Sequence, residues 1–153
     1  MENDKIIKKA GSQAGLTMIE FLVVIAIVVI ILAVLMVAIN NFQARSRDDK
    51  RVVEIKALQD ALAIYQIHIA SYPLPDQAEP LVVDGEDALS SVLINEKAMS
   101  SAIHDPVAGP KENINYVYTY QSVDSGKSYL IKYCLETSAI KDRQQGCGNE
   151  ASP

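Results

Sequence analysis

An uninterrupted apolar run constrains this chain more than any other feature of its sequence. Residues 21–39 hold about 19 consecutive apolar side chains, without a charge, a proline or a glycine. At about 1.5 Å per residue, a helix of this length approaches the roughly 30 Å hydrocarbon thickness of a bilayer. The run therefore predicts a membrane-spanning helix over residues 16–40, with the carboxylate of Glu20 at its entrance.

The rest of the chain leaves room for one small domain. Of its 153 residues, roughly 110 remain once the span and the residues before it are set aside. The net charge is -5, and an acidic domain argues against a nucleic-acid partner, because phosphate binding needs clustered lysine and arginine. We therefore expect Tyr116, Tyr118 and Tyr120 to lie in a core and not to stack on bases.

The sequence offers no support for enzyme chemistry. His68 and His104 have no histidine or cysteine at ligand spacing, and no glycine-rich phosphate loop is present. We expect both to be ordinary structural histidines, and we expect no catalytic residue, no metal site and no cofactor.

The first 15 residues are typical of a cytoplasmic leader, being short and polar with three lysines. The apolar run that follows is longer than the core of an ordinary secretory signal, and no convincing cleavage site comes after it. Charge does not settle the orientation, because basic residues also follow the span and their count alone favours the opposite topology. These residues are Arg45, Arg47, Lys50, Arg51 and Lys56.

Residues 41–72 change to the pattern of an amphipathic helix, whose apolar stripe needs a partner surface. The stripe comprises Val52, Ile55, Leu58, Leu62, Tyr65 and Ile69, widened by Ala57, Ala61 and Ile64. No breaker precedes Pro73, so we expect one helix of roughly 55 residues that ends near Tyr72, and whether it is kinked stays open. Residues 45–51 are expected to form a solvated turn, in which Asp48 and Asp49 pair with basic neighbours; a binding role is the alternative.

Residues 73–153 are predicted to form a globular region that ends in a polar tail. The expected order begins with a loop over 76–85, a helix within 86–99 and a turn-rich loop over 104–110. Alternating aromatic and aliphatic residues then predict strands over 115–121 and 128–136, joined as an antiparallel hairpin by a turn at 123–127. The apolar face of the second strand should cover the helix stripe, which gives an α+β fold.

The two cysteines, Cys134 and Cys147, both follow the span. Cys134 falls on the face of the second strand that points away from the helix, from where it can reach Cys147 in the tail. In an oxidising compartment we expect a disulfide, worth on the order of 2 to 3 kcal/mol. In a reducing compartment both would stay free thiols.

A specific motif precedes the span: Gly15-Leu16-Thr17-Met18-Ile19-Glu20-Phe21. It resembles the N-termini of type IV pilins and of the pseudopilins of type II secretion and competence systems. By this resemblance, a prepilin peptidase cuts between Gly15 and Leu16 and methylates the new amine of Leu16. The resemblance also implies that Thr17 and Glu20 serve subunit assembly, with Glu20 pairing with the Leu16 amine of a neighbouring subunit.

The resemblance implies a pilin-like fold and a structural subunit of a helical filament, used for motility, adhesion or DNA uptake. The implied partners are further copies of the chain, related pilins, the prepilin peptidase, membrane lipid and the assembly machinery of the inner membrane. The implied location is the inner membrane, crossed once with the C-terminal region outside the cytoplasm, and then a filament at the cell surface or in the periplasm. Two alternatives stay open: a pseudopilin of a type II secretion system, and a single-pass membrane-anchored binding module that does not polymerise.

Overall fold

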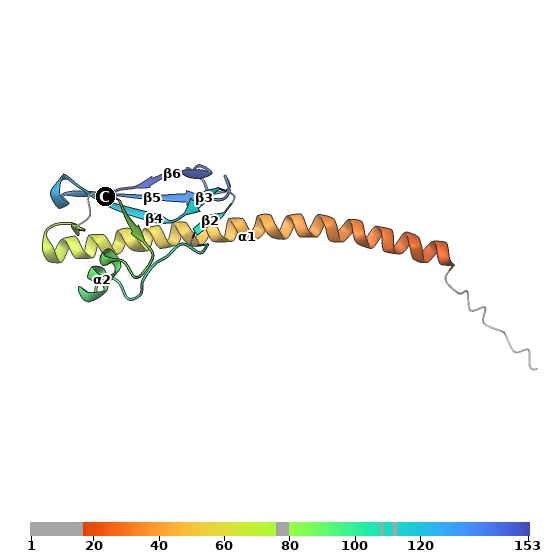
Figure 1. Cartoon of the computed structure of the whole chain (residues 1–153), viewed down its shortest axis with the longest axis horizontal. Coiled ribbons are helices and arrows are strands. Elements are labelled where there is room, and N and C mark those ends of the chain that lie inside the picture. The colour runs from red at the N-terminus through yellow and green to blue at the C-terminus, as the bar shows by residue number, and fades with distance from the viewer. Residues whose placement is uncertain (1–16, 76–79, 108, 112) are drawn as a thin grey trace, which may run out of the picture. The chain divides into compact units, whose positions relative to one another are not determined.

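The computed structural model describes residues 17–75, 80–107, 109–111 and 113–153. The chain divides into two compact units, Met1–Ile39 and Asn40–Pro153. Figure 1 shows the elements, which in chain order are α1 (Met18–Ile69), β1 (Leu81–Val83), α2 (Ala88–Asn95), β2 (Gly109–Lys111), β3 (Ile114–Tyr116), β4 (Tyr118–Val123), the 3-10 turn η1 (Asp124–Gly126), β5 (Ser128–Leu135) and β6 (Gly146–Ala151). Helix α1 has residues in both units, whereas every other element belongs to the second.

Helix α1 is continuous over 52 residues, as the lack of a helix breaker predicts. In the described part of the chain, it is the one helix that is long and apolar enough to cross a membrane. It ends at Ile69, three residues before the predicted end at Tyr72. The backbone leaves the helix at Ala70, which has a left-handed φ of 64° while its N–H still donates to the carbonyl of Gln66 at 2.8 Å.

The second unit is built on a four-stranded antiparallel sheet in the order β1-β4-β5-β6. Strands β4 and β5 form the predicted hairpin, with Tyr120 opposite Ile131. The turn between them contains Gly126 at a φ of 85°, where a Cβ would lie 3.1 Å from the carbonyl oxygen of Tyr72. The N–H of Tyr72 donates to the carbonyl of Gly126 at 2.8 Å. A glycine therefore lets the hairpin turn dock against the chain just after α1.

Parts of the predicted sheet are wrong. The strand expected over 115–121 is broken at Val117, so that β3 pairs with β2 in a separate two-stranded sheet while β4 joins the main sheet. Strand β1 occupies part of the expected loop over 76–85, and β6 occupies part of the expected polar tail. Strand β1 has only three residues, and β6 is a polar edge strand with one neighbour, so neither carries an apolar alternation.

The short helix predicted within residues 86–99 is α2. Asp87 is its N-cap, because its carboxylate accepts the backbone N–H of Ser90 at 2.9 Å and the hydroxyl of the same serine at 2.7 Å. Leu89 and Leu93 are buried in the core, so the helix covers one side of the domain.

The core lies between α1 and the sheet. Its α1 members are Ile55, Leu58, Ala61 and Leu62, and its β4 and β5 members are Tyr118, Tyr120, Tyr129, Ile131, Tyr133 and Leu135. The apolar face of the second strand thus covers the helix stripe as predicted, and the tyrosine row, including Tyr116, is buried. The stripe ends earlier than predicted, since Ile64 and Ile69 are 40% and 46% exposed. The α+β, pilin-like arrangement of a long N-terminal helix packed on a small antiparallel sheet is confirmed.

Two of the buried tyrosines place their hydroxyls in hydrogen bonds at the edges of this core, whereas the buried hydroxyl of Tyr133 has no hydrogen-bond partner among the described residues. Tyr118 donates to Glu54 at 2.7 Å, and Tyr120 donates to the carbonyl of Pro73 at 2.9 Å. Burial, reinforced for Tyr118 by Glu54, raises the pKa of both phenols above its ordinary value. Both side chains therefore stay neutral and join α1 and the segment after it to β4.

We predict that Leu58→Ala lowers the free energy of unfolding by about 2 to 5 kcal/mol, because the side chain is fully buried and its removal leaves a cavity. Val53→Ala is the matched control on the same helix, since Val53 is 68% exposed and its change should stay within about 0.5 kcal/mol. Urea unfolding of the full chain in detergent, followed by near-UV circular dichroism, measures both. Equal losses would contradict the packing.

Candidate functional site

The N-terminal motif enters the described structure at Thr17. Gly15 and Leu16, the predicted cleavage and methylation positions, lie outside the described residues. Thr17 directly precedes α1, its hydroxyl accepts the backbone N–H of Glu20 at 3.3 Å, and its carbonyl accepts the N–H of Phe21 at 3.2 Å. Thr17 is therefore the N-cap of α1 and satisfies a donor that the first turn leaves free.

Glu20 occupies the third helical position after this cap. The spacing from Thr17 is that of a capping box, in which the glutamate would bond back to the cap. Within the described residues, however, the exposed Glu20 carboxylate makes no hydrogen bond or ion pair. The threonine caps the helix without it, so the charge lies at the start of an apolar helix with no partner in the described chain.

The helix beyond Glu20 is apolar around its whole circumference. Its large side chains from Met18 to Ile39 are all 45% exposed or more, and no residue of its most apolar stretch is buried within the chain. An exposed apolar surface of this extent is stable only when lipid or other protein covers it. This part of the structure is suited to insertion into a bilayer or to packing against other helices.

The second unit contains a partly buried group of six charged side chains, here called the ion cluster: Arg47, Asp48, Arg51, Asp105, Lys111 and Glu136. Arg51 is at its centre and is fully buried, as is Asp48. Its Nε and Nη2 donate to the carboxylate of Asp105 at 2.7 and 2.9 Å. Its Nη1 donates to Asp48 at 2.8 Å and to Glu136 at 2.9 Å. The guanidinium also lies 4.6 Å from the ring centre of Tyr116, where a cation is attracted by the π face.

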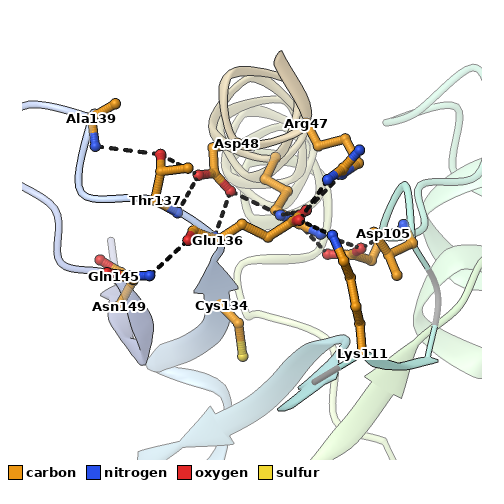
Figure 2. Close-up of polar contacts among 12 residues, drawn as sticks. Arg47, Asp48, Asp105, Lys111, Cys134, Glu136, Thr137, Ala139, Gln145 and Asn149 are labelled. Atoms are coloured by element: carbon orange, nitrogen blue, oxygen red, sulfur yellow. Dashed lines mark hydrogen bonds and ion pairs between the residues drawn. The ribbon is translucent and has the colours of Figure 1, made fainter. Parts of the chain in front are cut away.

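Asp48 joins α1 to the end of β5. Its two carboxylate oxygens accept the backbone N–H groups of Glu136 and Thr137, each at 2.8 Å, and the hydroxyl of Thr137 at 2.7 Å. Figure 2 shows these bonds meeting directly beneath the helix. The aspartate thereby accepts two backbone N–H groups at the end of the strand that would otherwise be unpaired.

Glu136 gathers the remaining cations. Arg47 donates Nε and Nη2 to its two oxygens, both at 2.6 Å, and Lys111 reaches it from β2 (Figure 2). The hydrogen bonds from Arg47, helped by Lys111 and Arg51 and opposed by burial, lower the pKa of Glu136 to about 2. Burial alone would lower the pKa of Arg51, but its hydrogen bonds to Asp105 and the other carboxylates raise it above its ordinary value. With three cations and three carboxylates, the cluster is neutral.

The expectation of a solvated turn over residues 45–51 is wrong for Asp48 and Arg51. Positions 48, 51, 55, 58 and 62 are separated by three, four, three and four residues, so the two charges continue the buried stripe by one more turn. That spacing is the signal by which they could have been found. Burial of such charges is tolerated because each has several partners.

The remaining positions predicted from the sequence are the two cysteines and the two histidines. Cys134 and Cys147 form the expected disulfide, across 13 residues of sequence. The disulfide lies beside the ion cluster, because the residues next to it are bonded there. Gln145, just before Cys147, donates to the carbonyl of Glu136, just after Cys134, at 2.9 Å (Figure 2). His68 and His104 belong to no group of three potential metal ligands among the described residues.

Comparisons of the chain with protein-family models, with curated proteins and with solved structures each find no match. Two features of the molecule itself then bear on its function: the capped apolar helix with an unpaired carboxylate, and the domain that the ion cluster fastens to the same helix.

We predict that the domain loses stability as the pH falls from 4.5 towards 2. The pKa of Glu136 is lowered on folding, so its contribution is complete above the unfolded pKa and is lost as the carboxylate protonates; it amounts to about 3 kcal/mol. Glu136→Gln should remove a similar amount at pH 7 and flatten this acid dependence. Urea unfolding of the full chain in detergent across this pH range measures the effect.

Glu150→Gln is the matched control. Glu150 also pairs with one lysine, Lys132 at 3.3 Å, but both side chains are half exposed, so the change should alter stability by less than about 1 kcal/mol. If Glu136→Gln loses stability between pH 4.5 and 2 as steeply as the wild type, protonation of Glu136 does not cause the acid destabilisation.

Proposed function

We propose that the chain is a type IV pilin-like subunit, cut between Gly15 and Leu16 and polymerised into a filament through its N-terminal helix. The motif Gly15-Leu16-Thr17-Met18-Ile19-Glu20 directly before a membrane-length apolar helix supports this proposal. The architecture supports it too, because one helix supplies both a wholly exposed apolar part and a part covered by a sheet. Such a chain can be stored in a membrane and later assembled non-covalently.

The observation that carries the proposal is the unpaired carboxylate of Glu20. A charge within a membrane-length apolar segment costs free energy unless it reaches the interface or finds a partner, and such residues usually serve a function. Capping does not require it, since Thr17 already bonds to the N–H of Glu20. In a processed chain the amine of Leu16 carries a positive charge, opposite to that of Glu20. The Leu16 amine of a neighbouring subunit would supply the missing partner.

Two features support an orientation with the second unit outside the cytoplasm. The chain has a disulfide, which persists in an oxidising compartment. The basic residues after the span, whose count favours the opposite orientation, are largely held by carboxylates. Arg47 and Arg51 belong to the ion cluster, while Lys50 pairs with Glu54 at 3.5 Å and Lys56 with Asp60 at 2.9 Å. A structural need in the folded domain therefore accounts for Arg47 and Arg51, the two of these residues in the ion cluster.

We predict that Gly15→Val leaves the leader attached, because a peptidase that accepts only a small residue before the cut excludes the branched side chain. Gly11→Val is the matched control, since it makes the same change within the same leader and should leave processing intact. N-terminal sequencing of the membrane fraction reads both. Normal processing of Gly15→Val would refute the proposed cleavage position.

We predict that Glu20→Ala abolishes incorporation into filaments while membrane insertion persists, because the change removes the charge but keeps the apolar helix. Glu150→Ala, an exposed carboxylate in β6, should assemble normally. Shearing the cells and identifying the protein in the released and membrane fractions measures both steps. Wild-type amounts of Glu20→Ala in sheared fibres would sink the assigned role of Glu20.

The same fractionation separates the proposed pilin from its alternatives. Processed protein in sheared extracellular fibres is the expected result. Processed protein that stays with the cell would instead indicate a secretion pseudopilin, and an intact N-terminal Met1 would indicate a membrane-anchored binding module.

A further inference from the structure

A polar hollow opens beside the ion cluster in the second unit. Its volume is about 460 Å³. Its walls come from the α1 residues just after Ile39, from the β2 and β3 strands and from the segments at the ends of β5 and β6. The polar side chains that line it include Asn40, Asn41, Gln43, Arg47, Lys111 and Glu136.

The two cations of this hollow are held in place by Glu136, and each keeps hydrogen-bond donors available for a ligand. Arg47 and Lys111 both reach Glu136 (Figure 2), and their side chains remain 26% and 38% exposed. Arg47 gives Nε and Nη2 to the glutamate, so among the described residues its Nη1 has no hydrogen-bond partner. Lys111 has three donors, of which Glu136 takes one. Two cations and one carboxylate line the hollow, within an ion cluster that is neutral as a whole.

The surrounding carboxamides suit an anion with several oxygens. Asn40, Asn41 and Gln43 each carry two N–H donors, and the side chain of none of them bonds to another described residue. Fixed cations that neighbour free amide donors match a phosphate group, because charge-assisted hydrogen bonds to phosphate oxygens are the strong ones. The carboxylate of Glu136 keeps the cations oriented, so little ordering is needed on binding.

The position of the hollow along the chain selects the source of the phosphate. Asn40 and Asn41 are the first polar residues after the apolar run that ends at Ile39. If that run spans the hydrocarbon core, the residues that directly follow it lie at the level of the lipid headgroups. Lysine and arginine at this level are attracted to anionic lipids by about 1 kcal/mol each.

We propose that this hollow binds the phosphate of an anionic phospholipid headgroup, with Lys111 and Arg47 as the charged contacts and with Asn40 and Asn41, which directly follow the apolar run, as further donors. The proposal rests on the membrane-inserted state of the proposed function. It assigns to the domain a lipid contact of its own, separate from the burial of the apolar helix. A lipid held there would be released when the subunit leaves the bilayer.

The test uses the full chain in nanodiscs that contain equal amounts of phosphatidylglycerol and phosphatidylcholine, with native mass spectrometry to count the lipids that the released protein retains. The wild type should retain phosphatidylglycerol in preference. Lys111→Gln should lower this retention about fivefold, the equivalent of one interfacial cation, and Lys111→Arg should restore it. Asn41→Ala should also lower retention, and it alters an exposed residue with no role in the core.

Lys132→Gln is the matched control, because Lys132 also pairs with one glutamate and is 51% exposed, but lies outside the hollow. Its retention should equal that of the wild type. Retention at the wild-type level in both Lys111→Gln and Asn41→Ala would overturn the proposal. A loss in Lys132→Gln as large as that in Lys111→Gln would overturn it too. Displacement of the lipid by inorganic phosphate at no more than the concentration of the lipid would also overturn it, since the site would then prefer a free ion.

Vesicle flotation of the wild type separates this proposal from the proposed function. A chain that floats with the vesicles but retains no phosphatidylglycerol contradicts the headgroup site alone. A chain that fails to float contradicts membrane anchoring, and with it both proposals.

Discussion

The fold depends on one buried guanidinium. Arg51 bonds at once to Asp48 on its own helix, to Asp105 before β2 and to Glu136 after β5. Apolar packing between α1 and the sheet is strong but non-directional, whereas these bonds hold only in one geometry. Sliding the helix by a turn would leave a buried charge unpaired, which costs several kcal/mol. The cluster therefore sets the register in which the helix lies against the sheet.

The two parts of helix α1 differ in which of their side chains are buried. Up to Ile39 its apolar side chains are exposed on every side, which suits lipid or neighbouring helices. From Asp48 to Leu62 it buries a single stripe, which begins with charges and continues with Ile55 and Leu58. The proposed filament subunit would use both kinds of surface, one to exchange between environments and one to keep its domain fixed.

Much of this structure is predictable because its signals are local. The stripe through Leu58 and Leu62 and the alternation in β4 and β5 give the helix, the hairpin and the face that joins them. The stripe spacing could have indicated that Asp48 and Arg51 are buried, but it does not reveal their distant partners. Asp105 and Glu136 lie 54 and 85 residues from Arg51 along the chain, and charges normally indicate solvent. Likewise β6 is polar, and its place in the sheet follows from hydrogen bonds to β5 and not from apolar side chains. The N-terminal cap is local and predictable, whereas a partner for Glu20 within the described chain is absent.

The disulfide guards one edge of the main sheet. Strand β6 pairs with β5 alone and carries the cysteine that is bonded to Cys134 of that strand. If β6 came away, the outer edge of β5 would present unpaired N–H and C=O groups that a strand of another molecule could occupy. The Cys134–Cys147 bond keeps β6 tethered to β5 through such an opening. A covalent link across 13 residues of sequence therefore protects the molecule against exchange of its edge strand.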